Sequence, residues 1–558
     1  MDSLFSVAAL AVLGTPLFVS VLGFLKFKEN ARLMRKISAG GAAIAFLAAI
    51  GLGYGVITEG SIDRIYAILG DPAGFHFSIG VWIDRLSVLS VLLITSIGLV
   101  VQRYSVRYLD GDPNQGRFFS WLSFVLFSVT LFVVSRNLLG LTLSWFLVSS
   151  GVHQLLLHFS ERESAQKAAW RKFVISRLGD LFLVAALVLT YTVFGTFELK
   201  DIFEIARNHG SWDPIQFLGM SLNPFAVLGS FYVLGAMTKS AQFPFHIWLP
   251  DTMETPTPVS ALMHAGIINA GGFLIVRLSP LVGHASTALH LLFILGALTA
   301  LFGGLIYLVQ TDAKRSLAYS TIAQMGYMMM QCGLGAFAAA VLHLIMHGYY
   351  KAHAFLSAAG RVDLKPIMYG NQQPVTETSL ASRLIAGLIA FVILVTSILV
   401  LSIDVNAKPG GLFLCLFLWI SALQALAPVV GSSGGVRSLL ATSVISFGGM
   451  VLYWTLLGAI TQWLGPVLGA DETVGLVGDL NPAVVALTAV VFIAVYVMVE
   501  MARLSQEQEW SKKLYVLCLN HFYVEQAWRK IILKVLGKTK LMPSFETLAL
   551  EKDIQTYH

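Results

Sequence analysis

Long apolar stretches recur along the chain from about residue 5 to about residue 502, and mostly short polar segments separate them. A membrane-spanning helix needs about 20 predominantly apolar residues, and about fifteen stretches reach that length. Their approximate limits are 5–25, 37–57, 80–101, 118–135, 138–158, 173–194, 225–250, 256–279, 287–309, 316–335, 337–360, 382–403, 411–430, 436–460 and 482–502. The pattern predicts an all-α polytopic membrane protein with at least one helix broken by prolines.

The order of these stretches predicts four parts. Residues 1–115 form N-terminal transmembrane helices, 116–360 form the central core, 361–502 form C-terminal transmembrane helices, and 503–558 form a tail. The tail segment LYVLCLNHFYVEQAWRKIILKVL places apolar residues at helical spacing beside Lys and Arg. We expect this amphipathic tail to lie along the cytoplasmic surface or to dock on a partner.

Composition and charge agree with a membrane protein. The chain has 558 residues, of which 56% are hydrophobic and 12% are charged, and its mean hydropathy is +0.75. Cytoplasmic loops are enriched in Lys and Arg. When the loops alternate from an external N-terminus, the inner loops and the tail hold a roughly fivefold excess of basic residues over the outer loops. This predicts an external N-terminus and a cytoplasmic C-terminus, and the net charge of +6 needs no nucleic-acid partner.

The cysteines and glycines do not indicate a cofactor in this chain. Cys332, Cys415 and Cys518 are far apart in sequence and form no CxxC pair, so they predict neither a zinc site nor an iron–sulfur cluster. No GxGxxG or Walker A sequence occurs between a strand and a helix. We therefore expect any redox or hydration chemistry to reside in another subunit.

The stretch MTKSAQFPFHIWLPDTMETPTPVSALMHAG, residues 237–266, places five ionisable groups among apolar residues and prolines: Lys239, His246, Asp251, Glu254 and His264. A charge at membrane depth costs about 2.5–3.5 kcal/mol, so such groups face the protein interior or water and usually have a role. Proline breaks the helix and exposes polar helix ends there. Lys239 is our candidate proton carrier; the alternative is a lysine that extends to the membrane surface.

The segment VLHLIMHGYYKAHAF places His343, His347 and Lys351 at i, i+4 and i+8. On a helix these three share one stripe about 12 Å long. Histidine titrates near physiological pH, so the stripe predicts a row of proton carriers. The alternative is a set of core histidines that bond the backbone. His353 lies on a different face.

Three further groups are less specific. His264 could connect Lys239 to the histidine stripe, or it could be structural. Arg177 and Asp180, three residues apart on one helix, either tune a proton site or neutralise each other. Asp312, Lys314 and Arg315 precede a span, and we expect them to act mainly in helix capping and topology.

At these residues the chain resembles the proton-translocating antiporter-like subunits of respiratory complex I and of Mrp-type cation/proton antiporters. The resemblance rests on TKSAQFPFHIWLPDTMETPTPVSALMHA, QTDAKRSLAYSTIAQMGYM and HLIMHGYYKA, within about residues 80–360. It implies a fold with inverted repeats. It also implies that the family's broken-helix lysine is Lys239, its connecting histidine is His264, and its central row is His343, His347 and Lys351.

The chain departs from this family at two places. The family's span-five glutamate should fall in LTLSWFLVSSG, where Ser144, Trp145 and Phe146 stand. The family's charged segment in a later broken helix is also absent, because SRLIAGLIAFVILVTSILVL carries no charge after Arg383. The chain also ends soon after the fifteenth span, without the long lateral helix of the complex I subunit.

With these departures, and with the wording HAGIINAGGFLIVRLSPL and LYVLCLNHFYVEQAW, the chain is similar to the DabB family of bacterial inorganic-carbon accumulation complexes. The resemblance implies a multi-pass subunit of the bacterial inner membrane. It also implies a cytoplasmic partner of the DabA type, a zinc protein resembling a β-carbonic anhydrase, which would convert CO2 to bicarbonate. No cofactor is expected in this chain itself.

Two functions therefore remain open, and they use similar residues in opposite directions. The first is a channel, most simply for H+ but also compatible with Na+, that uses the gradient to drive the carbonic-anhydrase-like partner. The second is a proton-pumping subunit of a complex I or Mrp-type complex. The missing glutamate and lateral helix favour the first. An intramembrane enzyme finds little support, because no nucleophile with a base and no metal cluster stands out.

Overall fold

The computed structural model of the protein describes residues 2–27, 30–70, 76–208, 214–217, 219–358, 379–406, 410–430, 435–468, 480–524 and 526. Helices dominate, and among these residues twelve helices are long and apolar enough to cross a membrane. The predicted count of about fifteen is therefore not confirmed. The three predicted spans outside the twelve are 225–250, which is interrupted, and 316–335 and 337–360, whose helices carry many polar residues.

The first part of the chain packs five helices together: α1 (Asp2–Leu22), α2 (Ala31–Glu59), α3 (Arg85–Tyr108), α4 (Gln115–Val134) and α5 (Leu138–Leu156). Asparagine and aspartate begin three of these helices, because their side chains accept hydrogen bonds from the first free backbone N–H groups. Asn30 caps α2, Asp84 caps α3 and Asn137 caps α5. Apolar residues of these helices form one continuous core with the central helices.

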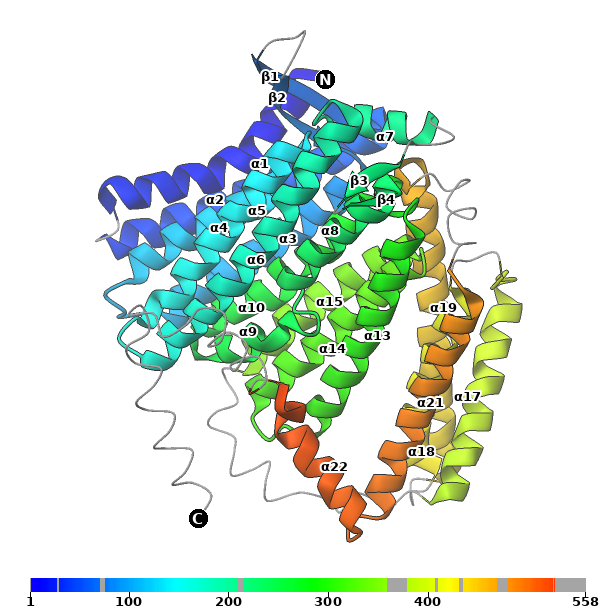
Figure 1. Ribbon diagram of the computed structural model, residues 1–558. Helices are drawn as coiled ribbons and strands as arrows, with labels where there is room; N and C mark the ends of the chain where they lie inside the picture. The colour runs from blue at the N-terminus through cyan, green and yellow to red at the C-terminus, as the bar shows by residue number, and fades with distance from the viewer. Residues whose placement is uncertain are drawn as a thin grey trace.

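Two short antiparallel hairpins, within residues 62–83 and 215–222, interrupt the mostly helical chain. Strands β1 (Ile62–Gly70) and β2 (His76–Ile83) pair from Ile62 opposite Ile83 to Gly70 opposite His76, and β3 (Ile215–Phe217) pairs with β4 (Met220–Leu222). Helix α7 (Leu199–Asn208) lies at the same end of the molecule as β1 and β2 (Figure 1). The β1–β2 hairpin and α7 thus mark one end of the molecule.

The central helices include two interrupted ones. After α6 (Glu163–Phe194), helix α8 (Pro224–Lys239) stops at Lys239, and short helical turns follow before α10 (Thr257–Ala265). The chain breaks again at Ile267–Asn269 before α11 (Ala270–Arg277). Helix α9 (Trp248–Asp251) is one of the turns between α8 and α10, and α12 (Ser279–Val282) follows α11. The predicted proline-broken helix is therefore present.

Helices α13 (Ser286–Val309), α14 (Ala313–Gly333) and α15 (Phe337–Ala358) complete the core. Asp312 caps α14 by accepting a hydrogen bond from the Arg315 backbone N–H, as predicted. Glycines let α13 and α14 approach closely, because a Cβ on Gly296 would lie 2.6 Å from the Met330 backbone nitrogen. Close backbone contact of this kind is the usual means of helix association in membranes.

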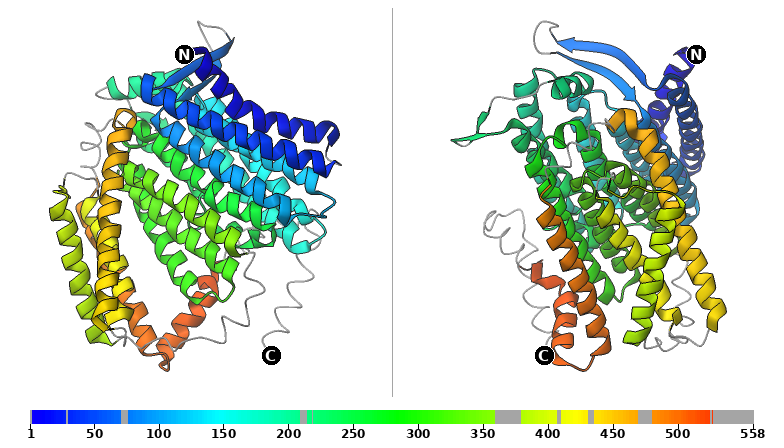
Figure 2. Two further views of the ribbon diagram at one scale, coloured as in Figure 1. Left: turned by 180° about the vertical axis from the view of Figure 1, so that it is seen from behind. Right: turned by 90° about the vertical axis from the view of Figure 1, so that its right-hand side faces the viewer.

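The C-terminal helices α17 (Leu380–Val400), α18 (Gly411–Val430), α19 (Gly435–Leu468) and α21 (Pro482–Leu504) lie together on one flank of the core (Figures 1 and 2). Reciprocal hydrogen bonds between Arg85 and Trp463 join α19 to α3. Helix α22 (Glu509–Leu519) lies at the opposite end of the molecule from β1 and β2 (Figure 1). The predicted tail beyond residue 526 lies outside the described residues.

Candidate functional site: buried ionisable side chains at two helix breaks

Lys239 is the last residue of α8, where the helix breaks, and its side chain points back into the core. It is 6% exposed. Its Nζ donates a hydrogen bond to the Trp145 carbonyl of α5 at 2.9 Å and lies 3.9 Å from the centre of the Trp145 ring. The lysine is thus held by a carbonyl and an aromatic face, and not by a carboxylate on α5. Phe146, at the position of the family glutamate, packs against the apolar core.

Asp180 of α6 is the carboxylate that reaches this region. It is 7% exposed and lies 2.7 Å from Arg177, and it interacts electrostatically with Lys239. Gly179 makes this approach possible, because a Cβ there would lie 2.0 Å from the Thr238 hydroxyl of α8. The predicted Arg177–Asp180 pair therefore exists and lies near Lys239.

His264 occupies the last turn of α10, directly before the second break. It is fully buried, with Nδ1 3.0 Å from the Thr321 hydroxyl and its ring stacked on Phe355 at 4.3 Å. Its Nε2 has no hydrogen-bond partner among the described residues. Ser240 donates to the Ile268 carbonyl at 2.6 Å, so the two breaks contact each other.

The predicted stripe on α15 is present. His343 and His347 lie with ring centres 5.9 Å apart, and Nδ1 of His343 is 3.0 Å from the Gln331 side-chain oxygen. Within the described chain, neither ring nitrogen of His347 has a hydrogen-bond partner. Lys351 is fully buried and donates to the Leu317 carbonyl at 3.0 Å and to the Ser320 hydroxyl.

Three predicted residues of the broken segment lie apart from this series. His246 is buried between Phe243 and Phe302. Asp251 pairs with Arg171 at 2.6 Å, and Glu254 is exposed. The structure places these three between α8 and α10, and among the interactions of the described residues no ion pair or hydrogen bond joins them to Lys239.

Several polar residues near the site were not predicted from the sequence. Lys172 of α6 is 4% exposed and donates to the Ser149 carbonyl at 2.6 Å. Thr321, Gln331 and Ser320 of α14 provide the partners of the α10 and α15 groups. The sequence indicated these α14 residues only by their helical spacing, which matches that of the charged stripe. The α14 sequence alone does not say which helix it faces.

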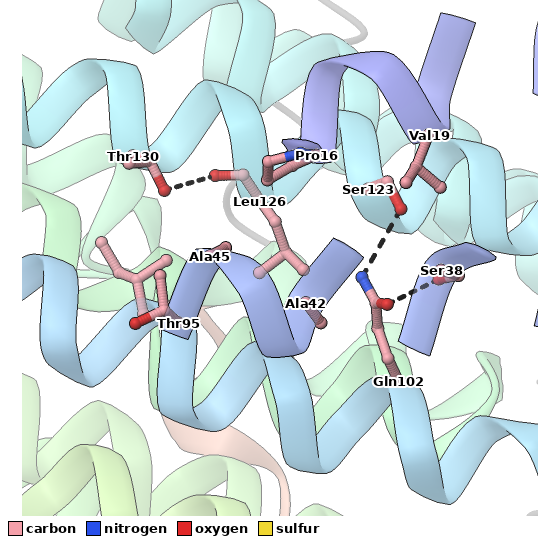
Figure 3. Close-up of a pocket in the computed structure, with 11 residues that line it drawn as sticks. Pro16, Val19, Ser38, Ala42, Ala45, Thr95, Gln102, Ser123, Leu126 and Thr130 are labelled. Carbon is pink, nitrogen blue, oxygen red and sulfur yellow. Dashed lines mark hydrogen bonds between the residues drawn. The ribbon is translucent and has the colours of Figure 1, made fainter. Parts of the chain in front are cut away.

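A separate polar contact lies among the first four helices. The Ser38 hydroxyl donates a hydrogen bond to Oε1 of Gln102 at 2.5 Å, and Nε2 of Gln102 donates to the Ser123 hydroxyl at 3.5 Å. These residues lie beside a cavity of about 10 Å³ (Figure 3). That volume holds about one water molecule. Its lining carries no ionisable side chain, so we assign it to packing.

The buried groups form a series that can carry protons. Lys239 and Asp180 lie at the first break, His264 lies at the second, and it interacts electrostatically with His347 and Lys351. Amines and imidazoles accept and release single protons. Ring nitrogens and carboxylate oxygens without protein partners are places where water binds in a buried site.

Comparison with known proteins shows which family this chain belongs to. A family model described as NADH:quinone oxidoreductase/Mrp antiporter matches residues 135–365, and one described as complex I chain 5 N-terminus matches residues 71–119. The chain is 38% identical over 403 residues to the probable inorganic carbon transporter subunit DabB1 of Halothiobacillus neapolitanus, covering 69% of this chain and 71% of that protein. This chain belongs to the DabB family.

The wider family is also visible. The chain is 36% identical over 358 residues to NADH-ubiquinone oxidoreductase chain 5 of Dictyostelium discoideum, covering 62% of this chain but only 52% of that protein. The structure of the Mrp complex from Dietzia sp. has the same fold, with a TM-score of 0.61 and 21% identity, covering 96% of this chain and 60% of that one. The DabB family is therefore an antiporter-like membrane family, as the resemblance implied.

Proposed function

We propose that this protein is the ion-translocating membrane subunit of an energy-coupled inorganic carbon complex. The observation that carries the proposal is the buried series Lys239, Asp180, His264, His347 and Lys351, in a chain of the DabB family. Each buried charge costs about 2.5–3.5 kcal/mol of insertion energy. A series of such groups along two helix breaks is therefore better explained by transport than by stability.

The ion in this proposal is a proton. The side chains of the series are mainly amines and imidazoles, which carry protons, whereas hard metal cations select oxygen ligands. His343 extends the series along α15, and Arg177 holds Asp180. His246, Asp251 and Glu254 are assigned to the segment between the breaks, without a place in the proposed path.

The carbon chemistry belongs to a partner in this account. The partner is a DabA-like zinc protein on the cytoplasmic side of the bacterial inner membrane, with the N-terminus of this chain external. Zinc lowers the pKa of bound water to about 7 and so supplies hydroxide for CO2 hydration. One proton crossing 100 mV releases about 2.3 kcal/mol, which is enough to bias hydration toward bicarbonate.

A pumping subunit of a complex I or Mrp-type complex is the alternative, favoured by the similarity to chain 5. Two contacts favour the channel. Lys239 bonds a carbonyl where a pumping site would offer the α5 glutamate. In α17 the charged residue is Arg383, and it pairs with Glu500 of α21. The charged segment that the family carries in its later broken helix is therefore not supplied by α17.

Growth of a carbonic-anhydrase-deficient host in ambient air tests the proposal. Cells that express this chain together with its partner should grow. Cells that express the partner with the Lys239→Ala variant of this chain should not. Rescue by the partner alone would show that the membrane subunit contributes no energy.

A further inference from the structure

A pocket of about 400 Å³ lies where α5 ends and α6 begins, large enough for several water molecules. Its lining includes His153, Ser160, Gln166 and Trp170, and Ser160 is exposed. Helix α6 runs from this pocket to the end of the molecule that carries α7 and the β1–β2 hairpin (Figure 1). The pocket therefore opens at the opposite end, beside the helix that carries Asp180.

His153 forms part of the pocket wall and is half-buried. Its Nδ1 lies 3.3 Å from the Ala169 carbonyl of α6. A carbonyl oxygen can only accept a hydrogen bond, so Nδ1 carries the hydrogen. In the neutral ring Nε2 then keeps its lone pair and can take a proton from water.

Lys172 lies behind His153 and interacts electrostatically with it. Lys172 bonds the Ser149 carbonyl, and Lys239 bonds the Trp145 carbonyl. Those carbonyls are four residues apart on α5, so they stack one turn apart, about 6 Å along the axis. The same face of α5 therefore holds both amines.

The space around these amines contains polar atoms that lack partners. The Ser149 hydroxyl, Oδ1 of Asp180 and Nε of Arg177 are buried and have no hydrogen-bond partner among the described residues. Buried polar atoms in proteins are normally satisfied, so bound water is the expected partner. Asp180 interacts electrostatically with both lysines, and water can bridge the three groups.

Lys167 and Arg171, two basic groups of α6 near the pocket, are engaged in ion pairs. Lys167 pairs with Glu163 at 2.7 Å, Arg171 with Asp251 at 2.6 Å, and His158 lies 3.0 Å from Asp112. Lys172 differs, because its hydrogen-bond acceptor is a neutral carbonyl. Among the described residues Lys172 has no ion-pair partner, and burying an unpaired ammonium group is costly, which argues against a purely structural role.

We propose that His153 and Lys172 form the entry side of the proton path. A proton from water in the pocket binds His153 Nε2, passes through water to the amine of Lys172, and then moves by Asp180 to Lys239. The proton is the transferred species, and each group returns to its starting state. This inference rests on the proposed proton translocation and adds its route of entry.

Proton flux into liposomes that contain the purified complex tests the route, with a pH-sensitive dye inside. Lys172→Met and Lys172→Arg are each expected to lower the flux about tenfold or more. Arginine keeps the charge but does not release its proton, so it separates proton transfer from electrostatic positioning. His153→Gln keeps a donor for the Ala169 carbonyl and should also lower the flux. Lys167→Met, on the surface of the same helix, is the matched control.

The outcomes separate the entry route from the proposed function. Normal flux in Lys172→Arg would overturn a carrier role for Lys172, and normal flux in His153→Gln would overturn the entry at the pocket. If flux were normal in both variants but absent in Lys239→Ala, translocation would stand without this route. Absence of flux in the wild-type complex would contradict the proposed function itself. If a Lys172 variant failed to assemble, His153→Gln would still decide the entry point.

Discussion

Lys239 is bonded by the Trp145 carbonyl and ring, and Asp180 retains Arg177 as its partner. Replacing Lys239 with alanine therefore removes a buried amine without leaving Asp180 unpaired. We predict that Lys239→Ala lowers carbon uptake to about a tenth or less while the complex still assembles. Co-purification of the partner together with uptake checks both parts. An assembled mutant with full uptake would end the assignment of Lys239.

The α15 stripe makes a second prediction at residue scale. His343 and His347 line the stripe that leads to buried Lys351, whereas His353 is exposed on another face. His343→Ala or His347→Ala should lower uptake more than His353→Ala, because only the first two interrupt the row. Equal losses in all three variants, measured at equal expression, would remove the geometric argument.

Phe146 gives the third prediction. A glutamate at this position, one residue from the Lys239 contact, would stabilise the charged ammonium and hold its proton. We therefore expect Phe146→Glu to impair uptake, and Phe146→Gln, of similar size without charge, to impair it less. Uptake in Phe146→Glu at or above the wild-type level would show that the missing carboxylate is unimportant for the direction of coupling.

The residues of the site were predictable where sequence spacing defines a helix face. His343, His347 and Lys351 repeat every four residues, and the prolines around Lys239 announce a broken helix. Lys172 precedes the predicted span 173–194, so its position in the sequence indicates only a basic loop residue. Its burial depends on α5 and α6 packing together, which local spacing does not specify. Its distance of eight residues from Asp180 was the available signal.

At the scale of elements, ion pairs attach the β1–β2 hairpin to the helices. Asp63 of β1 lies 2.7 Å from both Arg136 and Lys200, and Arg136 also pairs with Glu198. Burial by itself raises the pKa of Asp63, but hydrogen bonds and charges from Arg136 and Lys200 outweigh it and hold the pKa below the usual 3.8. The ionised carboxylate is therefore favoured by folding.

This depressed pKa predicts an acid-labile hairpin. The Asp63 contribution is complete above the unfolded-state value of 3.8 and is lost as the pH falls through the lower folded value. Hydrogen exchange of residues 62–70, corrected for the intrinsic rate, should increase below about pH 4. Asp63→Asn should already exchange faster at neutral pH and respond less to acid. Exchange that is independent of pH in the wild type would contradict this anchoring.

Elements were predicted unevenly, for physical reasons. Apolar length predicted most helices, and proline predicted the break after Lys239. Strands β1 and β2 were not predicted from the sequence, because a short hairpin needs neither apolar length nor a complete alternating pattern. Its position depends on distant partners such as Arg136 and Glu198, which become neighbours only in the fold. The inverted repeats and the division into four parts stay predictions.

At the scale of the whole molecule, the two helix breaks contact each other inside the core, while the β1–β2 hairpin and α7 lie at one end and α22 lies at the other (Figure 1). In the proposed function the ion path crosses this core through its buried ionisable groups. In the proposed complex that path releases the energy of the gradient, and the partner uses it to trap carbon as bicarbonate. A downhill path depends on the gradient for every round of accumulation.

Inorganic carbon accumulation in cells that carry this protein and its partner, with and without a protonophore, tests this account most directly. The sodium gradient is removed in both samples, and the Lys239→Ala complex supplies the baseline. The account predicts that collapse of the proton gradient lowers accumulation to that baseline. Accumulation that continues undiminished, with both gradients absent, would contradict the energy-coupling role of this subunit.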